Sequence, residues 1–263
     1  MMKQISSREN SLFKEFKALA QHSQARRKAG LCLLEGTHLC LAALQHDLKI
    51  QHAVLAEGSL AHPEIQAMLR QYPAIEAVLI VLADNLFAHI SQVENGVGLV
   101  FFAARPAPEL PATITQTAVV LDVVQDPGNM GSILRSAAAA GIRQVFCAPG
   151  SASAWSPKVL RAGMGAHFLL QIFEQVDLLQ LVAASALPKL ATSSHTSTTL
   201  YQANLAQDLI WMFGHEGQGL SQELAALASQ SVTIPQSAQL ESMNVAASAA
   251  VCFFEQVRQL HYQ

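Results

Sequence analysis

The sequence has few charged residues and no long hydrophobic run. Only 13% of its 263 residues are Asp, Glu, Lys or Arg, while 51% are hydrophobic, which is enough apolar material for packed cores. No apolar run approaches the roughly 18 residues that a membrane helix needs. The polar start MMKQISSREN also lacks the apolar segment of a signal peptide. We therefore expect a cytoplasmic protein without membrane contact.

Metal-binding and disulfide patterns are also missing. The four cysteines, Cys32, Cys40, Cys147 and Cys252, lie in apolar surroundings and show no C-x-x-C spacing. Such cysteines are typical of buried, reduced thiols. No cluster of ligands indicates a metal. Because the formal net charge is −3, any contact with nucleic acid must come from a local basic patch.

One such patch is present near the start of the chain. Seven of the 16 Lys and Arg residues lie within the first 28 positions, against only two acidic residues. A helix is predicted over residues 10–24, where apolar residues recur at helical spacing. A solvated helix face is the ordinary explanation for its lysines, but the asymmetry is larger than that requires. We therefore expect RNA phosphate contacts, with Lys14, Lys17, Arg26, Arg27 and Lys28 as candidates.

Strands and helices alternate in both halves of the chain, which indicates an α/β architecture. A segment with three prolines within six residues separates the halves and reads as an extended linker. We predict a first domain over 1–105, a linker over 106–116 and a second domain over 117–263. The predicted strands are 31–34, 53–56, 77–82, 97–102, 118–123, 144–147, 167–172, 187–192, 209–213 and 231–234. The main predicted helices are 39–44, 64–69, 85–90, 176–184, 222–228 and 243–262, besides one that follows the sequence DPGNMG.

The stretch 209–221, LIWMFGHEGQGLS, is the most informative part of the chain. Its apolar beginning is typical of a strand buried on both faces. Three glycines follow within six residues, and they let a backbone turn tightly and approach a ligand closely. Ser221 then caps a helix. A strand, glycine loop and helix start form a ligand-binding edge in many α/β proteins, although a plain strand-to-helix turn is the simpler alternative.

Two further loops carry polar residues at helix starts. Gly131 and Arg135 lie on one helix face, so the Arg135 side chain leans back over a position without a side chain. Its guanidinium can then join the backbone N–H groups that favour an anion at a helix start; a surface salt bridge is the commoner fate of an arginine. Near the C-terminal helix, either Ser242 or Asn244 can serve as the N-cap.

Three motifs therefore follow one another: Asn129-x-Gly131-x-x-x-Arg135, then GHEGQGLS at 214–221, then Ile234-Pro235 with ESMNV at 241–245. Together, over roughly 118–258, they resemble the SpoU (TrmH-like) branch of the SPOUT RNA methyltransferases. The first half, with LCLLEGTHLCLAAL, is similar to the family's ribosomal-protein-like substrate-binding domain. The resemblance implies an α/β SPOUT domain with a deep trefoil knot, and a homodimer formed through that C-terminal domain.

The resemblance also implies an activity, namely methyl transfer from S-adenosyl-L-methionine to a ribose 2′-hydroxyl, with rRNA favoured over tRNA and no metal. The implied catalytic residues are Asn129, Arg135, Glu216, Ser242 and Asn244. The implied cofactor-binding residues are Phe213, Gly214, His215, Gly217, Gly219, Ile234 and Met243. An arginine keeps its proton at ordinary pH, so we expect Arg135 to position a phosphate and to stabilise the developing alkoxide.

Two positions depart from the family pattern, since His215 stands where Asn is usual and Ala238 where Gly is usual. A non-catalytic RNA-binding relative is the alternative interpretation. The five intact polar residues argue against it. A P-loop enzyme is disfavoured because no lysine follows the glycine loop, and neither a G-x-G-x-x-G nor a G-x-S-x-G motif is present.

Overall fold

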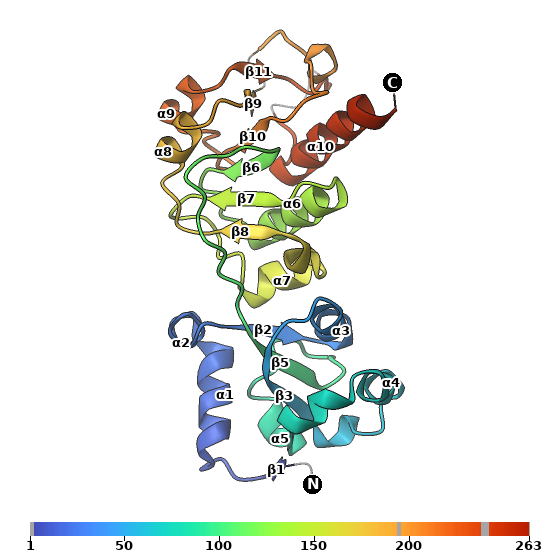
Figure 1. Ribbon diagram of the computed structural model, residues 1–263. Helices are drawn as coiled ribbons and strands as arrows, with labels where there is room; N and C mark the ends of the chain where they lie inside the picture. Colours follow the sequence, from blue (N-terminus) through green and yellow to red (C-terminus); the bar gives the residue numbers. More distant parts are fainter. Residues whose placement is uncertain (1–2, 194–195, 238–241, 263) are drawn as a thin grey trace. The chain divides into compact units, whose positions relative to one another are not determined.

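Two parts of the chain fold around separate sheets, as Figure 1 shows. The computed structural model describes residues 3–193, 196–237 and 242–262, so Ala238 and Glu241 of the third motif lie outside the described residues. The first unit comprises Met1–Pro106 and Trp155–Phe168, and the second comprises Ala107–Ala154 and Leu169–Gln263. The α/β class predicted from the sequence is confirmed in both units.

The first unit contains a mixed five-stranded sheet in the order β1-β4-β3-β5-β2. The first three strands of this order are parallel, and β5 joins β3 to β2 by antiparallel pairing. The strands are β1 (Lys3–Ile5), β2 (Leu31–Glu35), β3 (Ile50–Ala56), β4 (Leu79–Leu82) and β5 (Leu99–Ala104). The α-helices are α1 (Ser11–Gln21), α2 (Ser23–Ala29), α3 (Thr37–Gln45), α4 (Pro63–Gln71), α5 (Asp84–Phe87) and α7 (Pro157–Gly163). Short 3₁₀ turns span Glu57–Ser59 and Pro73–Val78.

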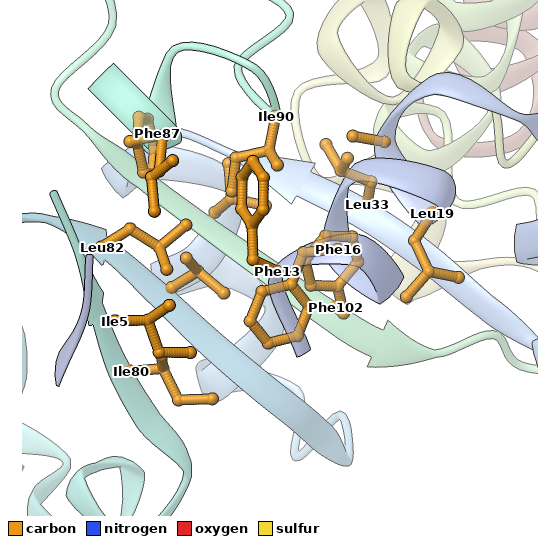
Figure 2. Packing of buried hydrophobic residues seen from close by; sticks show 14 of the residues in the cluster. Ile5, Phe13, Phe16, Leu19, Leu33, Ile80, Leu82, Phe87, Ile90 and Phe102 are labelled. Carbon is orange, nitrogen blue, oxygen red and sulfur yellow. The ribbon is translucent and has the colours of Figure 1, made fainter. Parts of the chain in front are cut away.

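Helix α1 covers one face of this sheet, and its apolar stripe forms the core shown in Figure 2. Asn10 caps the helix because its side chain accepts a hydrogen bond from the Leu12 N–H at 3.0 Å. Phe16 is fully buried and stacks on Phe102 of β5, with ring centroids 5.4 Å apart. Full burial of such a side chain contributes about 1.5–3 kcal/mol, so this stripe fixes α1 on the sheet.

The helix predicted over residues 10–24 is confirmed over Ser11–Gln21, but its end is wrong, because the chain breaks at His22 and α2 begins at Ser23. The basic cluster 26–28 belongs to α2, which ends at Gly30 in the left-handed conformation (φ 65°). The strand predicted over residues 167–172 is also wrong at its start. Ala166–Leu169 forms a 3₁₀ turn, and β8 comprises only Gln171–Phe173.

The second unit contains a six-stranded sheet in the order β11-β9-β10-β6-β7-β8, and every pairing within it is parallel. Its other strands are β6 (Ala118–Leu121), β7 (Gln144–Cys147), β9 (Lys189–Thr192), β10 (Ile210–Phe213) and β11 (Gln230–Val232). The apolar run that predicted β10 is fully buried between β6 and β9. A parallel sheet covered on both faces requires such runs.

Two pairs of helices cover this sheet. Helices α6 (Pro127–Ala139) and α10 (Val245–His261) pack together, as do α8 (Leu178–Ala183) and α9 (Gln222–Ala226). Figure 1 shows the two pairs on opposite faces of the sheet. The small residues Ala246 and Ala249 of α10 are buried, which allows this helix to approach its neighbours closely. No helix of the described residues is both long enough and apolar enough to cross a membrane.

Candidate active site

A cavity of about 720 Å³ lies where β9, β10 and β11 end. Thr192 at the end of β9, Gly214 after β10 and Thr233 after β11 all line it, together with the start of α10. Ligands bind at the carboxyl ends of the strands in open parallel sheets. The volume is also in the range of about 300–1,000 Å³ that is typical of small-molecule sites. This cavity is therefore the candidate ligand site.

The glycine loop closes on itself beside the cavity. The His215 N–H donates to the Gly219 carbonyl at 2.9 Å, and the Gly219 N–H donates back to the His215 carbonyl at 2.8 Å. A Cβ on Gly214 would collide with the backbone of Gly219 and Leu220, and Gly219 has φ 72° in the left-handed region. Both positions therefore need glycine, for close approach in one case and for backbone conformation in the other.

Glu216 ties this loop to the segment between β6 and α6. Its Oε1 accepts hydrogen bonds from the Asp126 N–H at 3.0 Å and from Asn129 Nδ2 at 3.1 Å, and its Oε2 accepts one from the Gln125 N–H at 3.2 Å. Burial by itself would raise the pKa of Glu216, but these donors, led by Asn129, together lower it below its usual value. The carboxylate therefore stays ionised at neutral pH.

Asn129 extends the connection to the third motif. Its Oδ1 accepts a hydrogen bond from Asn244 Nδ2 at 2.9 Å, while its own Nδ2 serves Glu216. Asn244 also caps α10, because its Oδ1 accepts from the N–H groups of Ala246 at 2.9 Å and Ala247 at 3.2 Å. The chain Glu216–Asn129–Asn244 therefore joins three segments that are far apart in the sequence.

Asp122 is a further anchor that the sequence reasoning missed. It follows β6, is 7% exposed, and accepts a hydrogen bond from the Ser221 N–H through Oδ2 at 2.8 Å. Ser221 begins α9 as expected, but no side-chain capping bond from it is present. Asp122 thus holds the end of the glycine loop where α9 begins.

Most of the predicted site residues lie together at the cavity. The lining includes Asn129, Gly214, His215, Glu216, Gly217, Gly219, Ile234, Ser242, Met243 and Asn244. Phe213 is fully buried in β10 and does not line the cavity. The sequence reasoning missed Thr192, Ser193, Thr233, Gln236 and Ser248. Thr192 and Thr233 could have been found from the sequence, because they lie at the ends of the strands β9 and β11.

Arg135 stands apart from this group. It lies on α6, six residues after Asn129, and is exposed rather than part of the cavity lining. In the described part of the chain, no hydrogen bond or ion pair joins its guanidinium to another residue. Its charge is therefore available to a ligand or to another molecule.

The basic patch of the first unit divides into inward and outward side chains. Arg26 Nη1 donates to the carbonyls of Leu19 at 2.6 Å and Ala20 at 3.1 Å, and burial lowers the pKa of this guanidinium. It therefore holds the end of α1. Lys14 pairs with Glu9 at 2.6 Å on the surface. The exposed side chains of Lys17, Arg27 and Lys28 remain the candidates for phosphate contact.

The cysteines have no reactive environment. All four are free and buried, and burial raises the pKa of the Cys32 and Cys252 thiols to about 12. Such thiols stay protonated and inert. Among the described residues, no group of three or more His, Cys, Asp or Glu side chains is arranged to hold a metal ion.

A parallel α/β sheet with a glycine loop, a cofactor-sized cavity and polar residues from three motifs is the arrangement of an RNA methyltransferase of the SPOUT class. Comparison with known proteins gives the same result. The SpoU rRNA Methylase family matches residues 116–254, and the MRM3-like substrate binding domain matches residues 10–100. The chain belongs to the SpoU rRNA methylase family, as its motifs predicted. This membership implies the trefoil knot.

Relatives and solved structures match over nearly the whole chain. An uncharacterized tRNA/rRNA methyltransferase of Synechocystis is 32% identical over 97% of this chain and 93% of its own length. The 23S rRNA (guanosine(2553)-2′-O)-methyltransferase RlmP of Bacillus subtilis is 26% identical over 96% of this chain and 98% of its own. A crystal structure of an RNA 2′-O ribose methyltransferase has a TM-score of 0.82 and 29% identity, covering 97% of this chain and 98% of that one.

Proposed function

We propose that this protein transfers a methyl group from S-adenosyl-L-methionine to a ribose 2′-hydroxyl of rRNA. The observation that carries the proposal is the hydrogen-bonded chain Glu216–Asn129–Asn244 at the mouth of one cavity. Similar proteins named as 2′-O-methyltransferases of 23S rRNA, such as RlmP of Bacillus subtilis, favour rRNA over tRNA. A cytoplasmic location is part of the same proposal.

The cavity fits the cofactor in size and in lining. Leu220, Ile234 and Met243 offer apolar contacts for a purine and for the carbon chain beside the sulfonium, while Ser242 offers a hydroxyl group. This mixture of an apolar lining and a few polar groups is usual for cofactor sites. When bound, S-adenosyl-L-methionine supplies a methyl group on a sulfonium, and the neutral thioether that remains after transfer is an excellent leaving group. The protein is therefore left to align the reacting atoms and to help the hydroxyl lose its proton.

The charged residues divide this work. Glu216 is a poor base, because three hydrogen bonds stabilise its ionised form. Its part is to hold Asn129 in place. Arg135 cannot act as a base either, because a guanidinium keeps its proton. We assign to Arg135 the positioning of a substrate phosphate and the stabilisation of negative charge on the 2′-oxygen as the proton leaves.

We further propose a homodimer formed through α6 and α10. Phe254 of α10 is 49% exposed, and Leu260 is 44% exposed further along the same helix. Arg135 lies on α6, which packs against α10, yet does not line the cavity of its own chain. A second copy related by a two-fold axis would cover the apolar side chains. The same arrangement would allow Arg135 of one copy to serve the cavity of the other.

The dimer is tested by sedimentation of the wild type and Phe254→Glu. A charge at this position should give a folded monomer with little methyltransferase activity. A Phe254→Glu protein that remains a dimer would remove α10 from the interface.

We propose that the first domain, 1–105, binds the RNA, that 106–116 is the linker and that 117–263 carries the reaction. The match of residues 10–100 to a substrate binding domain supports this division. Exposed Lys17, Arg27 and Lys28 supply positive charge within a chain that is negative overall.

The function is tested by mapping 2′-O-methyl groups in the rRNA of a strain that lacks the gene. One rRNA position should lose its methyl group and regain it with the wild-type gene, but not with Arg135→Ala. Retention of every 2′-O-methyl group in rRNA would contradict the proposal. That result, combined with RNA binding by the purified protein, would favour a non-catalytic relative.

A further inference from the structure

The side chain of His215 holds the glycine loop from inside. Its Nδ1 accepts hydrogen bonds from the Gly217 N–H at 2.9 Å and from the Gln218 N–H at 3.2 Å. These two bonds fold residues 217 and 218 over the histidine ring, within the loop that lines the cavity. An imidazole nitrogen accepts hydrogen bonds only while it carries no proton. The observed loop therefore requires the neutral ring, with its proton on Nε2.

We infer that His215 is a positioning residue whose neutral ring keeps the loop closed, so that protonation of the ring weakens cofactor binding. The inference rests on the proposed function of the cavity. A protonated ring would point an N–H at two backbone N–H groups, so both hydrogen bonds would be lost and the loop would have to open. Histidine is the side chain that ordinarily changes charge between about pH 5 and 8. Cofactor affinity should therefore fall as the pH is lowered.

The surroundings of the ring support its assignment as the group that senses pH. Among the described residues that line the cavity, His215 and Glu216 are the two that ionise, and β9, β11 and α10 contribute uncharged residues. The pKa of Glu216 is already lowered, so this carboxylate stays charged throughout the range. The segment between β6 and α6 contributes the carboxylates of Asp122 and Asp126, which accept backbone N–H bonds. Glu223 lies exposed in the first turn of α9.

Asparagine is the informative replacement at this position. Its Oδ1 can accept a hydrogen bond from the backbone N–H two residues further on, as in an Asx turn, but it remains an acceptor at every pH. His215→Asn should therefore keep the loop closed and remove its dependence on pH. His215→Ala removes the acceptor and should bind weakly at every pH. His38→Asn changes an exposed histidine of the first unit in the same way and serves as the matched control.

The test is calorimetric titration of the full chain with S-adenosyl-homocysteine between pH 5.5 and 8.5. Wild type and His38→Asn should lose affinity toward acid, by up to about tenfold per pH unit, because one proton is linked to binding. His215→Asn is compared with its own affinity at pH 8.5, and this affinity should change little toward pH 5.5. Circular dichroism at each pH confirms that the proteins are folded.

Three outcomes would count against these inferences, and they are distinguishable. Equal loss of affinity toward acid in wild type and His215→Asn would overturn the role of His215. So would a wild-type affinity that does not change with pH. Absence of binding by the folded wild type at every pH would instead overturn the proposed cofactor site, and the inference with it.

Discussion

Replacement of Glu216 by alanine removes the connection between the glycine loop and the start of α6. Three hydrogen bonds are lost, from the N–H groups of Gln125 and Asp126 and from the Asn129 side chain. A hydrogen bond contributes a net 0.5–1.5 kcal/mol as a rough range. Each of these bonds contributes an energy near the low end of this range, because Glu216 is exposed and water can take the place of its carboxylate. Together they hold the loop with about 2 kcal/mol, since each bond then contributes a little over 0.5 kcal/mol.

If cofactor binding requires the ordered glycine loop, the loss of these hydrogen bonds lowers the affinity for the cofactor. A cost of about 2 kcal/mol corresponds to a roughly 30-fold increase in the Kd of S-adenosyl-homocysteine, which calorimetry at pH 8 measures directly. Glu223→Ala is the matched control, because it removes the same charge from an exposed position in the first turn of α9. The folded core should remain intact in both variants. Equal affinities for Glu216→Ala and Glu223→Ala would refute the reasoning.

The remaining predictions concern catalysis, RNA binding and the loop backbone. Arg135→Ala should bind S-adenosyl-homocysteine normally but methylate RNA about a hundredfold more slowly, or worse, in single-turnover assays. Arg135→Lys should restore little of this rate, because the lysine ammonium is a point charge and lacks the planar, two-pronged guanidinium. Normal methylation rates would remove Arg135 from the mechanism. Replacement of Arg27 and Lys28 by Glu, which reverses their charge, should weaken RNA binding and flatten its salt dependence, because fewer counterions are released. A salt slope that stays unchanged in filter-binding assays would show that these side chains are only solvated. Gly214→Ala should lower the midpoint temperature of unfolding and abolish cofactor binding, because its Cβ collides with the backbone of Gly219. Calorimetry and thermal unfolding curves that match the wild type would contradict this.

Much of the second unit could be predicted because its strands are buried on both faces. The runs at β6 and β10 are continuously apolar, and they became neighbouring strands in the middle of the parallel sheet. Turn chemistry indicated the glycine loop, since Gly214 is the residue that a close backbone approach requires. At these positions the local sequence pattern favours the same structure that the tertiary packing requires, so the structure could be predicted from the sequence.

The contacts that set the direction of single side chains could not be predicted. Asp122 and Ser221 are 99 positions apart, and no local spacing indicates that a carboxylate meets that backbone N–H. Arg26 lies in a basic cluster that looks entirely solvated, yet it turns back to the end of α1. The three-residue strand β1 (Lys3–Ile5) is too short and too polar to show an alternating pattern.

The segment that follows α7 (Pro157–Gly163) shows a different reason for a wrong prediction. The apolar stretch at 166–170 has a strand-like composition, but Met164 and Gly165 before it have positive φ values of 50° and 88°. The chain turns there, and Ala166–Leu169 forms a 3₁₀ turn before β8 begins. Apolar composition alone does not distinguish a short buried turn from a short buried strand.

The central claim is that the cavity serves methyl transfer to a ribose hydroxyl of rRNA. The most direct measurement incubates the purified protein with S-adenosyl-methionine labelled in its methyl group and with rRNA from a strain that lacks the gene. The RNA is then digested to nucleosides, which are separated by mass. We expect label in one 2′-O-methylated nucleoside from a single rRNA position, and none with Arg135→Ala over the same time. Label in a base, or no label with folded protein that binds the cofactor, would contradict it.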